Sequence, residues 1–253
     1  MLGRIQGRLN RRIVTFLSFA AVLMMSWTAG ISPATANAAG EQVPAHTIPA
    51  AWQLRVLKDF GLTSYRDAIP HAKALPVKGR APKTGYKRSL YGTAWTDNAD
   101  VLYGHNGCRT REDILQRDLV AVRMREGSNC IVESGLLLDP YTAEIVYFVR
   151  GPQTSAEVQI DHVVALSDSW QKGAQQWEFQ KRVNFANDPR NLIAVSGYIN
   201  QQKGASDTAT WLPPNKAYRC EYVTRQVEVK RVYGLWVTQA EQDAMVRELS
   251  KCC

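Results

Sequence analysis

The sequence predicts an α+β fold, because strand and helix patterns follow one another along a single continuous stretch of chain. Three short runs, residues 132–138, 144–149 and 158–162, are rich in the β-branched, aromatic and other apolar residues typical of strands. Helical periodicity precedes and follows them. With 45% apolar residues among 253, the chain can bury a sizeable core, and its length allows one domain or two small ones.

Residues 1–38 are predicted to form a secretory signal peptide. Four arginines and no acidic residue fall within residues 1–12, a mainly apolar run covers residues 13–27, and small residues continue to an Ala-x-Ala site at 34–36 or 36–38. The apolar run is shorter than the roughly 20 residues of a spanning helix, which disfavours the alternative of a retained anchor. We therefore expect a secreted protein without a stable membrane anchor after cleavage.

Residues 39–89 are predicted to hold a short helix and a basic segment. Apolar positions over residues 50–60 suit a helix that ends at Gly61. The basic segment has six cations, no acid and several Pro and Gly residues; its cations are Lys73, Lys78, Arg80, Lys83, Lys87 and Arg88. Such a stripe is typical of phosphate contacts, with Lys83, Lys87 and Arg88 as our candidates. A solvated linker is an equally good interpretation of its composition.

The net charge of the chain gives only modest support to the hypothesis that the protein binds nucleic acid. The whole chain has 31 Lys and Arg against 23 Asp and Glu, a balance of +8. Without the four arginines of the predicted signal peptide, 27 basic residues face 23 acidic ones, a balance of +4. The electrostatic support therefore comes from the local stripe.

Five cysteines in a chain with an export signal predict disulfides before metal binding. Cys108 and Cys130 bracket a segment of helical pattern at residues 110–124, and a bridge between them would close a loop of about twenty residues. Cys220 is expected to pair with Cys252 or Cys253, which leaves one cysteine over. The chain has no C-x-x-C pair, so a structural zinc site is disfavoured.

Residues 90–253 are predicted to form one mixed α and β domain. Thr110 can cap a helix whose first turn carries Glu112 and Asp113, where negative charge suits the helix dipole. The turn at residues 139–141 joins the first two strands. The later elements are a strand at 158–162, a helix at 167–183, a short strand at 191–195 and a helix from Gly197 that contains Asn200.

Asp161 and His162, with Asn191 and Asn200 further along the chain, predict a centre for metal-assisted hydrolysis. A neutral imidazole with a pKa near 6.5 can take a proton from water at pH 7, which makes His162 the candidate general base. A hard divalent ion prefers oxygen ligands, so Asp161 and Asn200 are its candidate ligands. Asn191 would act indirectly, by bonding across a loop to hold the backbone that carries His162.

This site makes one geometric demand on the strand. Neighbouring residues on a regular strand point to opposite faces, so Asp161 and His162 can serve one site only if the strand ends or twists at Asp161. Arg190 and Lys203 lie nearby in the sequence and are candidate phosphate contacts. Each is equally well interpreted as a solvated surface cation.

These residues resemble the HNH, or His-Me finger, endonuclease family, particularly its secreted bacterial members with a GmrSD-type C-terminal domain. The resemblance rests on IDHVVALSDSW, FANDPRNLIAV and NQQKGASDTATWLPPN, and it runs from about Tyr91 to the C-terminus, including CRTREDILQRDL. It implies a ββα-metal core, built in the order strand, excursion, strand, helix, with surrounding helices and strands.

For the site, the resemblance implies metal-dependent DNA cleavage, with His162 as base, Asn191 as the middle letter of HNH, and Asp161 and Asn200 on Mg²⁺. Many members have histidine where this chain has Asn200. Because an oxygen ligand favours Mg²⁺ or Mn²⁺ over zinc or nickel, we expect Mg²⁺, with Mn²⁺ as the alternative.

We therefore expect a secreted, metal-dependent DNA endonuclease. Low sequence specificity is expected, because we find no recognition helix, zinc finger or other base-reading module in the sequence. The alternatives are a non-catalytic secreted nucleic-acid-binding protein and a nuclease that cuts RNA as well. The sequence identifies no inhibitor protein.

Overall fold

The computed structural model describes residues 50–252 and has the predicted α+β composition. The predicted signal peptide, residues 39–49 and Cys253 lie outside the described residues. No helix within 50–252 is long and apolar enough to cross a membrane. The helices are α1 (Ala50–Phe60), α2 (Ala68–Ala74), α3 (Thr110–Asp118), α4 (Leu166–Gln171), α5 (Phe179–Asn187), α6 (Gly197–Lys203), α7 (Arg219–Tyr233) and α8 (Gln239–Leu249). Short 3-10 turns lie at Tyr65–Asp67, Arg88–Tyr91, Ala174–Gln176 and Lys216–Tyr218.

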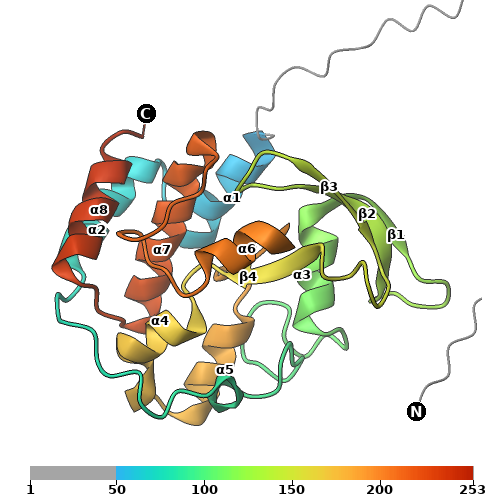
Figure 1. The fold of residues 1–253 in the computed structure, drawn as a ribbon, viewed down its shortest axis with the longest axis horizontal. Helices are drawn as coiled ribbons and strands as arrows, with labels where there is room; N and C mark the ends of the chain where they lie inside the picture. Colours follow the sequence, from blue (N-terminus) through green and yellow to red (C-terminus); the bar gives the residue numbers. More distant parts are fainter. Residues whose placement is uncertain (1–49, 253) are drawn as a thin grey trace, which may run out of the picture. The chain divides into compact units, whose positions relative to one another are not determined.

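An antiparallel sheet has the strand order β1 (Leu119–Met124), β2 (Val132–Leu138) and β3 (Ile145–Val149). The predicted turn joins β2 to β3, and Asp139 holds it by accepting hydrogen bonds from the Tyr141 backbone and the Thr142 hydroxyl. One face of the sheet buries Leu137 and Phe148 in a cluster that α3 shares. Figure 1 shows α3 between this sheet and strand β4, and the packing contacts agree.

The helical pattern predicted for residues 110–124 is wrong beyond Asp118. Residues from Leu119 onward form β1 instead, because their apolar and β-branched side chains pair with β2. Ala121 has a φ of +50°, and the strand register shifts between Val120 and Arg123, as at a β-bulge. An apolar run this short fits either a helix or a strand, so pairing decides its structure.

Thr110 does not cap α3, contrary to prediction. The N-cap is Arg109, and Thr110 is the first helical residue. Its hydroxyl lies 2.9 Å from the Thr96 carbonyl oxygen and 3.0 Å from Asn187 Oδ1, so it joins the start of α3 to a preceding loop and to the end of α5. Glu112 and Asp113 do lie in the first turn, as predicted.

Strands β4 (Val158–His162) and β5 (Leu192–Ser196) form a second antiparallel pair, and α6 packs against both. The excursion between them differs from the single helix predicted for residues 167–183. It contains α4, a 3-10 turn and α5, because Gly173 at φ +127° ends the first helix. This glycine also lies against Trp236, where an added Cβ would come within 3.2 Å of the indole ring.

Helix α1 ends before Gly61, which has a φ of +67°, as the sequence predicted. Helices α2, α7 and α8 pack together around a core that includes Ala72, Val223 and Met245. The described segments on both sides of the expected boundary near Ser89, residues 50–89 and 90–252, belong to one compact unit.

The basic segment is held against the rest of the fold, which a solvated linker would not be. The backbone N–H of Lys78 donates to the Val237 carbonyl at 2.9 Å, and that of Ala81 donates to the Gln171 carbonyl at 2.8 Å. The Trp170 indole donates to the Thr84 carbonyl. The segment is therefore a strap that crosses α4 on its way to the 3-10 turn at Arg88–Tyr91.

A network of three cations and three carboxylates, all of them buried except Arg80, fastens this strap. The Lys172 ammonium contacts three carboxylates at 2.6 to 2.8 Å and has no exposed side-chain surface. Lys230, equally buried, contacts two of the same carboxylates. Arg80, which belongs to the strap, pairs with two of the three carboxylates and so connects the strap to the network. The members are Arg80, Asp168, Lys172, Asp207, Lys230 and Glu241.

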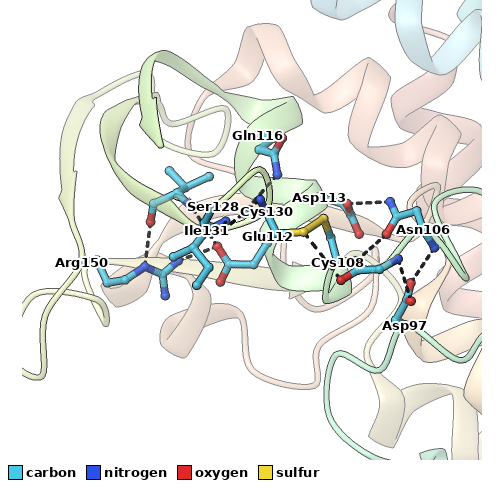
Figure 2. Close-up of a disulfide and its surroundings, with 12 residues drawn as sticks. Asp97, Asn106, Cys108, Glu112, Asp113, Gln116, Ser128, Cys130, Ile131 and Arg150 are labelled. Carbon is cyan, nitrogen blue, oxygen red and sulfur yellow. Dashed lines mark hydrogen bonds and ion pairs between the residues drawn. A yellow bond between two sulfur atoms is a disulfide. The ribbon is translucent and has the colours of Figure 1, made fainter. Parts of the chain in front are cut away.

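Two disulfides confirm the predicted pairings. Cys108 and Cys130 join the residues before α3 to the β1–β2 connection, with a Cα–Cα distance of 5.3 Å (Figure 2). Cys220 pairs with Cys252, one of its two predicted partners, at a Cα–Cα distance of 5.8 Å. This bridge joins α7 to the residues that follow α8. Closing loops of 22 and 32 residues contributes on the order of 3 kcal/mol for each bridge.

Candidate active site

A cavity of about 480 Å³ lies beside the end of β4. Three of the four predicted centre residues, Asp161, His162 and Asn200, line it. A second cavity of about 230 Å³ shares Arg88, Trp95 and His162 with the first. His162 therefore lies at the junction of two adjoining hollows.

The His162 imidazole is buried and oriented by two contacts. Its Nε2 lies 2.9 Å from the Ala186 carbonyl oxygen, which can only accept, so Nε2 carries the proton. Its ring stacks on Trp95, with ring centroids 5.4 Å apart and planes 15° apart. Within residues 50–252, Nδ1 makes no hydrogen bond. In the neutral ring, Nδ1 is thus the nitrogen with a free lone pair.

Burial lowers the pKa of His162 to about 3; nearby Arg88 and Lys203 add to the effect, and the hydrogen bond to Ala186 opposes it. A general base must be unprotonated before it can accept a proton. At neutral pH the folded protein therefore holds this imidazole unprotonated, and the same burial makes it a weaker base than a histidine with its ordinary pKa.

The lowered pKa of His162 predicts that the protein loses stability in acid. Between pH 6.5 and about 3 the unfolded chain binds a proton at this residue and the folded chain does not, so the free energy of unfolding falls as pH falls. The loss is at most about 1.4 kcal/mol per pH unit. Urea unfolding in EDTA at pH 7, 6, 5 and 4 would measure it. His162→Gln should lack this component, and parallel curves for parent and variant would contradict the prediction.

The strand was expected to end or twist at Asp161, but it continues for one more residue and ends at His162. Strand β4 stays paired with β5 through Asp161 and His162, opposite Ile193 and Leu192, and ends there. Regular pairing directs the two neighbouring side chains to opposite faces of the pair. We expected an irregular strand because both residues were to serve one site. The cavity lies at the end of the strand, and both Asp161 and His162 line it although the strand is regular.

Asp161 lies in a buried set of polar contacts. Its Oδ2 accepts a hydrogen bond from the Tyr141 hydroxyl at 2.6 Å, and its Oδ1 accepts one from Lys203 Nζ at 2.9 Å. Lys203 also donates to the His162 carbonyl oxygen at 2.9 Å. Burial raises the pKa of Asp161, and the charge of Lys203 opposes the rise.

Asn191 is fully buried in the turn before β5 and bonds to the loop that follows His162. Its Oδ1 accepts from the Val164 N–H at 2.8 Å, and its Nδ2 donates to the Val164 and Phe185 carbonyls. Its own carbonyl accepts from the Val163 N–H at 2.8 Å. These are the contacts that a bracing role requires, and the role itself stays a prediction.

Asp161 and Asn200 carry oxygen donors of the kind that a hard divalent ion prefers. The Asn200 Nδ2 donates to Gln159 Oε1 at 2.9 Å, and its Oδ1 makes no hydrogen bond with the described residues. Each Asp161 oxygen accepts one hydrogen bond and keeps a second lone pair. No group of three or more His, Cys, Asp or Glu gathers for a metal within residues 50–252. A metal here would therefore complete its coordination with water or phosphate oxygens.

The predicted phosphate-contacting cations are scattered. Lys203 is buried against Asp161, so the structure turns it away from solvent. Arg190 pairs with Asp188 and lines a different cavity. Lys83 and Lys87 are exposed on the strap. Arg88 alone among the five lines the cavities at His162.

Sequence reasoning missed several residues at the site. Arg111 and Gln159 line the cavity, Trp95 stacks on His162, and Tyr141 binds Asp161. Arg111 lies in the CRTREDILQRDL motif that carried part of the resemblance, so its motif could have singled it out. Trp95 and Tyr141 lie in loops far from His162 in sequence, and no local pattern marks them.

Residues 109–248 match the family model described as GmrSD restriction endonucleases, C-terminal domain. The match covers more than half of the chain and runs from the start of α3 into α8, so it includes all four predicted centre residues.

The chain belongs to the GmrSD C-terminal domain family. The match confirms the part of our expectation that concerned a GmrSD-type C-terminal domain of a nuclease family. An uncharacterized secreted protein of Arthroderma benhamiae is 37% identical to it over 180 residues, which cover 70% of this chain and 81% of that protein. No solved structure matches the chain. Membership of this family suggests a nuclease-type function and implies DNA as the substrate.

Proposed function

We propose that this protein is a secreted HNH-type endonuclease that hydrolyses DNA with a divalent metal ion and low sequence specificity. The observation that carries the proposal is His162. Burial keeps the imidazole unprotonated at neutral pH, Nε2 is held by the Ala186 carbonyl, and Nδ1 has no hydrogen-bond partner among residues 50–252. The ring lies where two cavities meet inside a GmrSD C-terminal domain. Nδ1 is suited to take the proton of a water molecule that attacks the phosphate.

The surrounding residues support this chemistry by fixing the base. Asn191 braces the backbone that follows His162, Trp95 limits tilting of the imidazole, and Ala186 fixes its tautomer. Asp161 and Asn200 would hold the metal ion, which when bound would offset charge that develops on the phosphate. Arg88 supplies a cation where the two cavities join.

Two observations support action outside the cytoplasm. Both disulfides suit an oxidising compartment, and the Arthroderma relative is described as secreted. The predicted signal peptide agrees with them. Low sequence specificity is proposed because no base-reading module was found in the sequence.

The proposal predicts metal-dependent cleavage that requires Asn200. Purified protein should cut supercoiled plasmid in Mg²⁺ or Mn²⁺ and not in EDTA, and Asn200→Ala should weaken Mn²⁺ binding about 10-fold or more through loss of its ligand oxygen. The matched control is Gln202→Ala, an exposed position on the same helix. Plasmid nicking on gels and Mn²⁺ titration by electron paramagnetic resonance would measure the two effects.

Each failure has a separate meaning. Undiminished cutting in EDTA would contradict the metal, and equal Mn²⁺ binding by parent and Asn200→Ala would remove Asn200 from the ligand set. If no metal supports cutting of plasmid or RNA while both are bound, the protein is the non-catalytic binding protein. Cutting of RNA alongside plasmid would widen the substrate class.

A further inference from the structure

Arg111 has a fixed guanidinium with unused donors. It lies in the first turn of α3, and its Nη2 donates to the Val158 carbonyl at 3.0 Å and to the Ser155 carbonyl at 3.2 Å. These contacts join it to the start of β4. Its Nε and Nη1 make no hydrogen bond with any residue from 50 to 252. Arg111 is thus oriented by the protein while part of its hydrogen-bonding fork stays free.

No carboxylate pairs with this guanidinium in the described part of the chain. The neighbouring acid, Glu112, is occupied by Arg150 and by the Val132 N–H, as Figure 2 shows in part. Burial lowers the pKa of Arg111; the charge of Glu112 opposes this, and Arg150 and Arg109 add to it. A partly buried cation without a counter-ion is unfavourable, so a bound anion would stabilise it.

The location of Arg111 indicates which anion this is. Arg111 lines the same 480 Å³ cavity as His162, Asn200 and Arg88. Asp161, the acidic residue in that lining, is already paired with Lys203. The cavity therefore has an excess of positive charge from two arginines, and guanidinium groups match phosphate oxygens in charge and geometry.

We propose that Arg111 is a phosphate-binding residue, which donates through its free Nε and Nη1 to the non-bridging oxygens of a nucleic acid phosphodiester in the His162 cavity. This inference rests on the proposed function, because it assigns a substrate contact in the same site. Arg88 contributes a second cation to the bound phosphate's surroundings. Through Arg111, helix α3 would then contact the substrate phosphate beside His162, although α3 is not part of the β4, β5 and α6 arrangement.

DNA binding by the His162→Gln protein tests this inference without cleavage. Fluorescence anisotropy with a short labelled duplex should show that adding Arg111→Gln weakens binding about tenfold or more and lowers the slope of log K against log salt by about one. Arg111→Lys keeps the charge, so its salt slope should match that of the starting protein while its affinity falls. The control is Arg247→Gln, an exposed arginine on α8, which should change neither quantity.

The outcomes separate this inference from the proposed function. If Arg111→Gln binds DNA as the starting protein does, with the same salt slope and thermal midpoint, Arg111 does not bind phosphate, whether or not the parent cuts DNA. If Arg111→Gln is poorly folded, an Arg111→Lys protein with undiminished affinity overturns the inference. A starting protein that binds no DNA overturns it as well. A parent that binds DNA through Arg111 without cutting contradicts only the proposed function.

Discussion

His162→Gln is expected to reduce DNA cleavage by about 10²- to 10⁴-fold, the range that general-base catalysis supplies. Glutamine can still donate a hydrogen bond to the Ala186 carbonyl, so the local fold should survive, but no side-chain atom can then accept the proton of the attacking water. Initial rates of plasmid nicking in Mg²⁺ would measure the loss. Metal binding should be retained, because the proposed ligands are unchanged.

His105→Gln is the matched control for this experiment. His105 is exposed, bonds to Asp100, and lies outside both cavities at His162. Its replacement should leave the cleavage rate within about twofold, as expected for a surface substitution away from a site. Equal rates for the parent and His162→Gln would exclude His162 as the base.

Lys172→Met should lower the free energy of unfolding by about 3–5 kcal/mol, the effect expected when one partner of a buried ionic network is removed. The network has equal numbers of cations and carboxylates, so the variant leaves one buried negative charge uncompensated. The strap should loosen as well, because Asp168 and Asp207 also hold Arg80. Urea or guanidinium unfolding at pH 7 would measure the change.

Two further variants make the interpretation specific. Lys58→Met replaces an exposed lysine at the end of α1 and should shift stability by no more than about 0.5 kcal/mol. Lys172→Met with Asp207→Asn removes one charge of each sign, so it should recover part of the stability lost in Lys172→Met. A loss below about 1 kcal/mol in Lys172→Met would contradict the expected cost of leaving one buried negative charge uncompensated.

Local signals allowed much of the fold to be predicted. The strands at Val132–Leu138 and Val158–His162 were predicted with the bounds that the structure has, because their side-chain pattern and flanking turns are local properties. The first disulfide and the end of α1 at Gly61 followed from residue type and spacing. The segment after Asp118 was mispredicted as helix, because its structure depends on pairing with β2, which is distant in sequence.

For the candidate site too, residue identities could be predicted from local motifs, whereas contacts between distant residues could not. Asp161, His162, Asn191 and Asn200 were singled out by short motifs, and three of them line one cavity. The charge of Lys203 was visible in the sequence, but its burial against Asp161 was not. The orientation of Arg111 depends on carbonyls more than forty residues away, and the Trp95 stacking on His162 depends on a loop before α3.

The sequence by itself determined which residue types are available for proton transfer, metal binding and disulfide formation, and in what chain order they occur. Only the tertiary structure decided the protonated nitrogen of His162, the counter-ion of Lys203 and which Arg111 donors stay free of residues 50–252. The physical reason is that a side chain's pKa and hydrogen bonding depend on burial and on neighbours within a few ångströms. Folding brings those neighbours from distant parts of the chain.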